Sequence, residues 1–211
     1  MKSKILSIGL LILIGIRASA QESPQRIIEQ VEKTLKSAET VKVVFTETFH
    51  WELTGEKQSV DGTLILGQDD RFHITTTDQV IVSDGTTLWT YSRPANRVLI
   101  DVLANSEDTM LPRQILFQYK KDYTARNAGN EKVNNVLCTL LEFTPDSEAE
   151  YITKVRVWID RKTWLPRKLE QTDLNGDRSV YDLTSLETGV EVSPDLFRFK
   201  APQGAEVIDM R

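Results

Sequence analysis

Hydrophobic and polar residues alternate along most of the chain, and the longest alternating run begins at Val41. From residue 41 to residue 53 the odd-numbered positions are mostly apolar or aromatic, whereas the even-numbered positions are mostly polar. A period of two is typical of a β-strand with one buried face. Glu47 interrupts the apolar parity, which predicts a bulge or a bend at that point.

Shorter runs of the same kind follow, separated by clusters of turn residues. Asp84-Gly85 predicts a tight hairpin turn, and short connections of this kind favour antiparallel neighbours. The remaining predicted strands span residues 59–66, 71–76, 80–83, 87–92, 98–102, 123–127, 135–144, 153–159, 167–172, 178–183 and 197–200. A meander of about eleven or twelve strands predicts one highly curved sheet or a barrel.

Two segments have helical spacing instead. Ser23-Pro24 has the form of a helix start, and Ile27, Val31 and Leu35 then recur on one face up to about residue 37. Residues 109–117 form a second, short apolar segment between the two blocks of strands. These two segments are the predicted covers of the sheet, whose apolar inner side is either filled by its own side chains or holds an apolar ligand.

The beginning of the chain reads as an export signal. Lys2 and Lys4 precede an apolar run from residue 5 to residue 16, and an Ala-Ser-Ala sequence ends at Ala20. This pattern predicts a cleavable signal peptide over residues 1–20 and a single exported, soluble domain over residues 21–211. An uncleaved membrane anchor is the alternative, although the apolar run is short for a membrane span.

Charge argues against a nucleic-acid partner. The chain carries 26 Lys and Arg against 31 Asp and Glu; removal of the three cations in the leader leaves 23 against 31, a balance of −8. Binding to phosphate backbones requires a basic surface. The length is that of one domain.

The residues that usually carry chemistry are few and scattered. His50 and His73 stand alone on strand-like runs, and Cys138 is the only cysteine, so the chain has no intramolecular disulfide. We expect a buried free thiol at Cys138, with a reactive thiol as the alternative. No metal-ligand spacing, nucleophile motif or phosphate-binding loop is recognisable, so we predict no catalytic residue, metal or cofactor. The basic pairs around Trp164 are either a turn with an apolar anchor or a docking edge for an anionic surface.

Several stretches together resemble the LolA family of periplasmic lipoprotein carriers. They are GTLIL, IVSDGTTLWTY followed by RPANRV, VWIDRKTWLP, and FRFKAPQGAEVID near the C-terminus. The resemblance implies a mainly β, α+β fold: an open, incomplete antiparallel β-barrel with a helical lid over an apolar cavity. It also implies a non-enzymatic carrier that takes acylated lipoproteins from an inner-membrane ABC transporter complex to an outer-membrane acceptor.

The resemblance, with strand parity and helix spacing, predicts the residues that contact lipid. The expected cavity wall includes Val41, Phe72, Ile74, Trp89 and Tyr91, and the expected lid face includes Leu35, Leu111, Ile115 and Leu116. We expect the carrier to be a monomer.

One position departs from the family pattern. Gln68 stands where the best-known members have an arginine that helps to hold the lid closed. This departure leaves open the alternative of a LolA-like module that binds or senses a different lipid or glycolipid.

Overall fold

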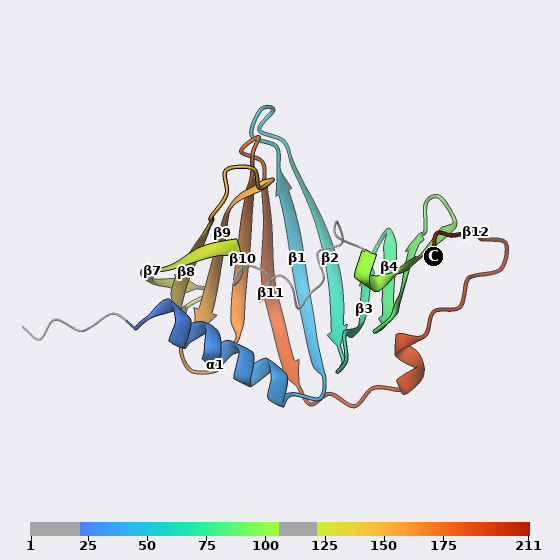
Figure 1. The fold of residues 1–211 in the computed structure, drawn as a ribbon, viewed down its shortest axis with the longest axis horizontal. Coiled ribbons are helices and arrows are strands. Elements are labelled where there is room, and N and C mark those ends of the chain that lie inside the picture. Colours follow the sequence, from blue (N-terminus) through green and yellow to red (C-terminus); the bar gives the residue numbers. More distant parts are fainter. Residues whose placement is uncertain (1–21, 106–121) are drawn as a thin grey trace, which may run out of the picture.

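The computed structural model describes residues 22–105 and 122–211, which form one large β-sheet with a single α-helix against it (Figure 1). Two 3-10 turns, η1 (Leu103–Asn105) and η2 (Pro194–Phe197), lie in the connections. The helix is α1 (Pro24–Ser37), and the strands are β1 (Val41–His50), β2 (Lys57–Leu66), β3 (Arg71–Thr76), β4 (Gln79–Asp84), β5 (Thr87–Ser92), β6 (Arg97–Val102), β7 (Tyr123–Val133), β8 (Val136–Pro145), β9 (Ile152–Asp160), β10 (Pro166–Asp173), β11 (Arg178–Thr188) and β12 (Glu206–Asp209).

α1 begins where its capping sequence predicts. Ser23 is the N-cap, and its side-chain oxygen accepts a hydrogen bond from the backbone N–H of Arg26 at 3.4 Å. Pro24 occupies the first turn, where its missing N–H has no helical partner to lose. The apolar stripe that includes Ile27 and Val31 is buried against the sheet.

Two antiparallel meanders make up the sheet. β1–β6 form one and β7–β11 form the other, and β11 pairs with β1 to join them. The strand order runs β12-β6-β5-β4-β3-β2-β1-β11-β10-β9-β8-β7. β12 and β7 are the two outer strands of this order, so the sheet is open. The predicted mainly β, incomplete barrel-like fold is therefore confirmed.

The bulge that Glu47 predicts lies two residues away from it. The register between β1 and β11 shifts between Val44 and Phe45, whereas the pairing of β1 with β2 is continuous. The extra residue is in β11, where the Thr184 hydroxyl donates to the Val44 carbonyl at 3.1 Å. Glu47 itself keeps its place on the apolar parity.

The prediction of the last strand is wrong. Residues 194–197 form η2, and the final strand is β12, which runs parallel to β6 with Val207 opposite Val98. Ser193 caps η2 by accepting a hydrogen bond from the Asp195 N–H. Phe197 is 3% exposed and packs against the sheet from η2. The alternation of Phe197 and Phe199 in the sequence therefore does not arise from a strand.

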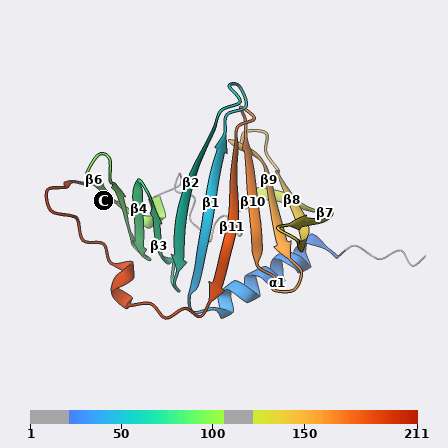
Figure 2. The ribbon, with the colours of Figure 1, turned by 180° about the vertical axis from the view of Figure 1, so that it is seen from behind.

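The two faces of the sheet differ in what covers them. α1 lies across the second meander on one face, which we call the helix face (Figure 1). Seen from the other side, which we call the outer face, the strands lie in front of α1 (Figure 2). The core under α1 contains Leu141 and Phe143 of β8, Val155, Val157 and Ile159 of β9, and Leu169 of β10.

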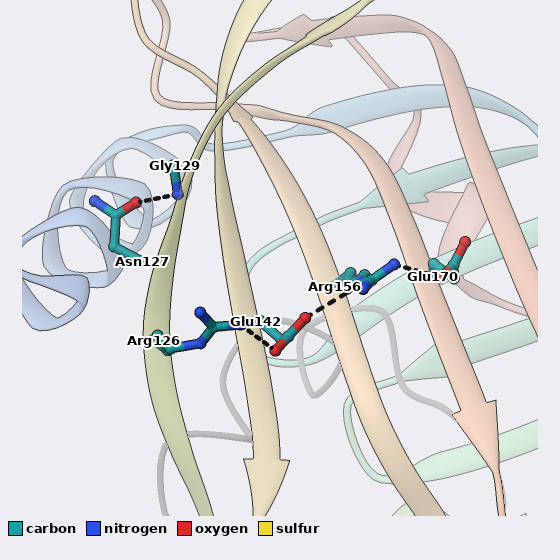
Figure 3. Close-up of polar contacts among 6 residues, drawn as sticks. All are labelled: Arg126, Asn127, Gly129, Glu142, Arg156 and Glu170. Carbon is teal, nitrogen blue, oxygen red and sulfur yellow. Dashed lines mark hydrogen bonds and ion pairs between the residues drawn. The ribbon is translucent and has the colours of Figure 1, made fainter.

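On the outer face the second meander carries a row of paired charges (Figure 3). Arg126 of β7 contacts Glu142 of β8 at 2.7 Å, Glu142 contacts Arg156 of β9 at 3.1 Å, and Arg156 contacts Glu170 of β10 at 3.6 Å. These residues occupy directly opposed positions on neighbouring strands. Opposite charges at such positions stabilise the pairing of the strands.

The start of α1 is tied to the edge strand of this meander. The Asn127 side-chain amide donates to the Glu22 carbonyl at 2.8 Å. The side-chain oxygen of Asn127 accepts from the Gly129 N–H at 3.0 Å, and Figure 3 shows this second bond. Gly129 has a φ of +109° at the β7 bulge, a conformation that suits glycine.

Within the described residues, no helix is both long and apolar enough to cross a membrane.

Candidate functional site

An apolar surface continues along the helix face beyond α1, over the first meander. One row crosses four strands through directly opposed residues: Val43 of β1, Leu64 of β2, Ile74 of β3 and Ile81 of β4. Val43 is buried, whereas Leu64, Ile74 and Ile81 are half-buried. The strand parity brings these side chains to one face because successive residues of a strand point to opposite sides.

A second row runs parallel to the first and is more deeply buried. Val41, Leu66, Phe72 and Leu88 lie on it in register, and Leu103 of η1 packs against the last two. The hydrophobic clusters around Val41 and around Phe72 share half-buried neighbours, including Leu64 and Ile74. The two rows therefore form one continuous apolar surface, which we call the aliphatic surface.

Phe45 extends the cluster of Val41 and Val43 along β1, and β11 adds Tyr181, Leu183 and Leu186 to it. The Phe45 ring lies over Gly62 of β2, and its centroid is 6.3 Å from that of Tyr181 on β11. A Cβ at position 62 would lie 2.8 Å from two ring carbons of Phe45, so only glycine leaves room for the ring.

Charged groups also lie on the helix face beside the aliphatic surface: Asp101 of β6 is directly opposite Leu88, and Glu47 lies on β1. Glu47 stands on β1 between Phe45 and Phe49, and its carboxylate accepts a hydrogen bond from the Tyr181 hydroxyl at 2.8 Å. Glu47 is half-buried, opposite Tyr181 on one side and Val60 on the other. Among the described residues, no lysine or arginine makes a salt bridge with Glu47.

The structure gathers four of the predicted contact residues. Val41, Phe72 and Ile74 lie on the helix face, and Leu35 of α1 packs against the cluster that contains Val41. Leu111, Ile115 and Leu116 lie outside the described residues, as does the predicted leader. Lipid contact by these residues stays a prediction.

Trp89 and Tyr91 are not on this surface, so their predicted place on the inner wall is corrected. Trp89 is opposite Val82 and Tyr91 is opposite Val80, which puts both on the outer face. The Tyr91 ring lies 6.0 Å from that of Phe199, in the segment that follows η2. That segment buries part of the outer face, which is why aromatic residues occur there.

Sequence reasoning missed Leu64, Ile81, Leu183 and Tyr181 as parts of the site. Leu64 shares the parity of Leu66 within GTLIL, and this signal was available in the sequence. Leu183 and Tyr181 depend on the register of β11 against β1, across more than 130 residues of chain, and no local pattern specifies that pairing.

The turn around Gln68 offers no cation to the helix face. Gln68 is exposed, and its backbone carbonyl accepts hydrogen bonds from the N–H and Nε of Arg71. The Arg71 guanidinium lies 5.5 Å from the centre of the Phe197 ring, against which β3 and β4 pack. Arg71 is thus directed to the outer face, away from the aliphatic surface.

The three titratable residues that the sequence analysis considered, His50, His73 and Cys138, lie outside the aliphatic surface. Burial lowers the pKa of His73 and raises the pKa of the Cys138 thiol, whose side chain is fully buried. Burial also lowers the pKa of His50, with Lys57 adding to the effect. No group of three or more metal-ligating side chains occurs in the part of the chain that the structure describes.

Of the two basic pairs around Trp164, the one at residues 167–168 has side-chain contacts within the protein, whereas residues 161–162 are exposed. Arg167 forms a salt bridge with the buried Asp160 at 3.1 Å, and the Lys168 ammonium lies 5.1 Å from the centre of the Trp158 ring. Trp164, with a φ of +58°, packs against the core under α1. These contacts favour the interpretation as a turn with an apolar anchor.

Comparison with known proteins gives a consistent assignment. The sequence profile described as "Outer membrane lipoprotein carrier protein LolA" matches residues 36–200. An outer-membrane lipoprotein carrier protein of Actinobacillus pleuropneumoniae is 22% identical, over 100% of this chain and 95% of that protein. A carrier of the same description from Alkalilimnicola ehrlichii is 28% identical over 78% of this chain and 75% of its own.

Other relatives are less informative about function. An uncharacterised protein of Methanocaldococcus jannaschii is 21% identical over 99% of this chain, and the match spans only 61% of that protein. The crystal structure of a conserved Thermus thermophilus protein superposes with a TM-score of 0.63 at 13% identity, covering 89% of this chain and 99% of its own. That of MucB gives 0.53 at 18% identity, over 87% and 64%. These similarities support the fold alone.

Proposed function

The chain belongs to the LolA family, and from this premise we propose that it carries the acyl chains of lipoproteins through the periplasm. In this proposal residues 1–20 are a cleaved export signal, and residues 21–211 are a single soluble carrier domain. The protein takes acylated lipoproteins from an inner-membrane ABC transporter complex, passes them to an outer-membrane acceptor, and catalyses no reaction.

The observation that carries the proposal is the row of half-buried aliphatic residues on the helix face. Leu64, Ile74 and Ile81 lie in register on three neighbouring strands, in the part of the helix face that α1 does not cover. Each methylene of an acyl chain that leaves water for such a surface gains about 0.8 kcal/mol. Several chains bound along two rows of this surface would be held mainly by their burial.

Binding of this kind also allows release. The two rows contain side chains without hydrogen-bonding groups, apart from Ser83 between Phe72 and Leu88. The Ser83 hydroxyl accepts a hydrogen bond from the Gly85 N–H and is fully buried. A ligand therefore breaks no directional bond with these rows on leaving, which suits a carrier that passes its cargo on.

The test compares substitutions at adjacent positions on opposite faces of one strand. Leu64→Gln places a polar amide in the aliphatic surface, whereas Thr63→Gln places the same group on the outer face. Purified variants are incubated with a triacylated lipoprotein and with its non-acylated form, and the soluble complex is isolated after dilution of the detergent.

We expect the wild-type protein and Thr63→Gln to retain the triacylated form, and Leu64→Gln to retain at least about tenfold less, which corresponds to about 1.4 kcal/mol. Circular dichroism and urea denaturation show that each variant is folded. Equal retention of acylated and non-acylated forms by the wild-type protein would contradict the proposal.

A second candidate function is transport or sensing of a different lipid. Glu47 on the helix face favours it, because its carboxylate lies where a ligand headgroup would meet it, and Gln68 in place of an arginine is a second departure from the family pattern. Native mass spectrometry of the protein isolated from its own compartment, followed by lipid extraction, distinguishes the two. Bound lipoprotein supports the first function, and bound free lipid supports the second.

A further inference from the structure

We infer that Glu47 forms a subsite for an ammonium group carried next to the acyl chains of the ligand. This inference rests on the proposed function, since it concerns the polar end of a ligand whose chains lie on the aliphatic surface. Two kinds of ligand share this chemistry: a diacylated lipoprotein with a free α-amine and a phospholipid with an ethanolamine headgroup.

The Glu47 carboxylate has fewer partners than the other carboxylates of low exposure on the sheet. Glu142 pairs with Arg126 and Arg156, and Asp160 pairs with Arg167 (Figure 3 shows the first set). Asp173 has no salt bridge among the described residues, but it accepts hydrogen bonds from the Tyr151 hydroxyl and from the backbone N–H groups of residues 175 and 177. Glu47 is half-buried between two aromatic residues of β1, and among the described residues the Tyr181 hydroxyl alone donates to it. Burial of a charge without an opposite charge is unfavourable, so this position calls for an explanation.

The Glu47 carboxylate has unused hydrogen-bonding capacity. An ionised carboxylate offers about four lone-pair sites, and the Tyr181 hydroxyl fills one of them. The hydrogen bond fixes Glu47 toward β11, because the two residues are directly opposed in the strand register. A donor group on a ligand can therefore meet a carboxylate that is already oriented.

Glu47 lies on β1 next to the aliphatic surface. Phe45 is the neighbour of Glu47 on the same face of β1, and Phe45 borders the aliphatic surface over Gly62. Acyl chains on that surface would run up to Phe45, and the polar end of the ligand would then reach Glu47. Phe49, which stacks edge-on with Trp51 at 4.6 Å, lies on the far side.

The negative charge of Glu47 discriminates between ligand headgroups. A carboxylate beside apolar rings attracts a cation more strongly than it would in water, since the local dielectric constant is lower. It repels phosphatidylglycerol headgroups and free fatty-acid carboxylates for the same reason. The subsite therefore favours acyl ligands with an ammonium group over neutral or anionic ones.

The experiment uses two peptide ligands that differ only in the ammonium group. One is an S-diacylglyceryl cysteine peptide with a free α-amine, and the other is the same peptide with an acetylated amine. Dioleoyl phosphatidylethanolamine and its N-acetyl derivative form a second pair. Each ligand competes with a fluorescent acyl probe for the wild-type protein, for Glu47→Gln and for Asp61→Asn.

Asp61→Asn is the matched control. Asp61 lies on β2 and accepts a hydrogen bond from Thr46 at 2.7 Å, so it is also a carboxylate paired with a hydroxyl, but it is on the outer face. We expect the wild-type protein and Asp61→Asn to prefer the free-amine ligand about tenfold. Glu47→Gln should lose this preference and keep its affinity for the acetylated ligand within about twofold.

Preference for only one of the two free-amine ligands would identify the source of the ammonium group. Equal binding of the free-amine and acetylated forms by the wild-type protein would overturn the inference and leave the proposed function intact. Displacement of the probe by none of the acylated ligands would instead count against the proposed function itself.

Discussion

The ring of Phe45 on β1 lies directly over Gly62 on β2, where the absence of a side chain on the glycine leaves room for the ring. The pair lies at the junction of the two meanders, because Phe45 also approaches Tyr181 on β11. Its geometry sets the border between the aliphatic surface and Glu47.

The first prediction follows from this contact. Gly62→Ala should destabilise the protein by about 1–3 kcal/mol, since the added methyl group overlaps the Phe45 ring and the ring must move. Urea denaturation monitored by circular dichroism measures the change. The double variant with Phe45→Leu should recover part of the loss, and a purely additive effect of the two substitutions would show that the ring does not cause it.

The second prediction separates the two faces of the first meander. Tyr91→Ala should lower the free energy of unfolding by about 1–2 kcal/mol, because it removes the contact with Phe199 on the outer face. Binding of an acylated ligand should stay within about twofold of wild type. Ile74→Ala should weaken that binding in a folded protein, as measured by competition with a fluorescent acyl probe. The reverse pattern would mean that the ligand lies on the outer face.

Strand alternation alone was enough to predict most of this fold. β3 and β5 have the predicted bounds, and α1 has the predicted cap. The assignment of strands to a face was less secure, since a shift of one residue reverses every side chain. Trp89 and Tyr91 suggested an inner wall by their aromatic character, but residues near the C-terminus cover the face on which they lie.

The site was less predictable than the fold because it combines residues that are far apart in sequence. Val41 and Phe72 were accessible through local parity, whereas the bond between Tyr181 and Glu47 depends on the pairing of β1 with β11. The bulge at Thr184 restores the parity that brings Leu183 opposite Phe45. A bulge of this kind has no distinctive local sequence signal here.

The third prediction concerns acid stability. The hydrogen bond from Arg126 lowers the pKa of Glu142, and Arg156 adds to this effect against the opposing influence of burial. A carboxyl with a lower pKa in the folded state contributes stability above its unfolded pKa of about 4.3, and this contribution is lost as the pH falls through the folded-state pKa.

Glu142→Gln should therefore cost about 1 kcal/mol of stability at neutral pH, and the difference from wild type should disappear in strong acid. Urea denaturation across this pH range measures the difference. Glu29→Gln, at an exposed position of α1, serves as the control and should have little effect at any pH. A difference that persists unchanged in acid would mean that Glu142 acts through packing instead of charge.

The fourth prediction tests for hidden chemistry. Joint replacement of His50, His73 and Cys138 by Gln, Gln and Ser should leave the transfer of an acylated ligand between carrier and acceptor membranes unchanged in rate. The physical reasons are that burial raises the pKa of the Cys138 thiol, which disfavours the nucleophilic thiolate, and that no group of three or more metal-ligating side chains occurs among the described residues. Loss of transfer in a folded triple variant would reveal a catalytic or ligand-binding role for one of them.

The parallel pairing of β12 with β6 also has a consequence for the order in which the protein is made. β6 is complete at residue 102, but its outer edge is covered only by residues 206–209. During synthesis, the backbone donors and acceptors of this edge are open to pairing with other chains until residues 206–209 are made. The edge of β1 is likewise uncovered until residues 178–188 form β11, which completes the centre of the sheet. The nascent protein therefore has an unpaired β1 edge until residues 178–188 are made and an unpaired β6 edge until residues 206–209 are made, and pairing of these edges with other chains makes it prone to aggregate in that interval.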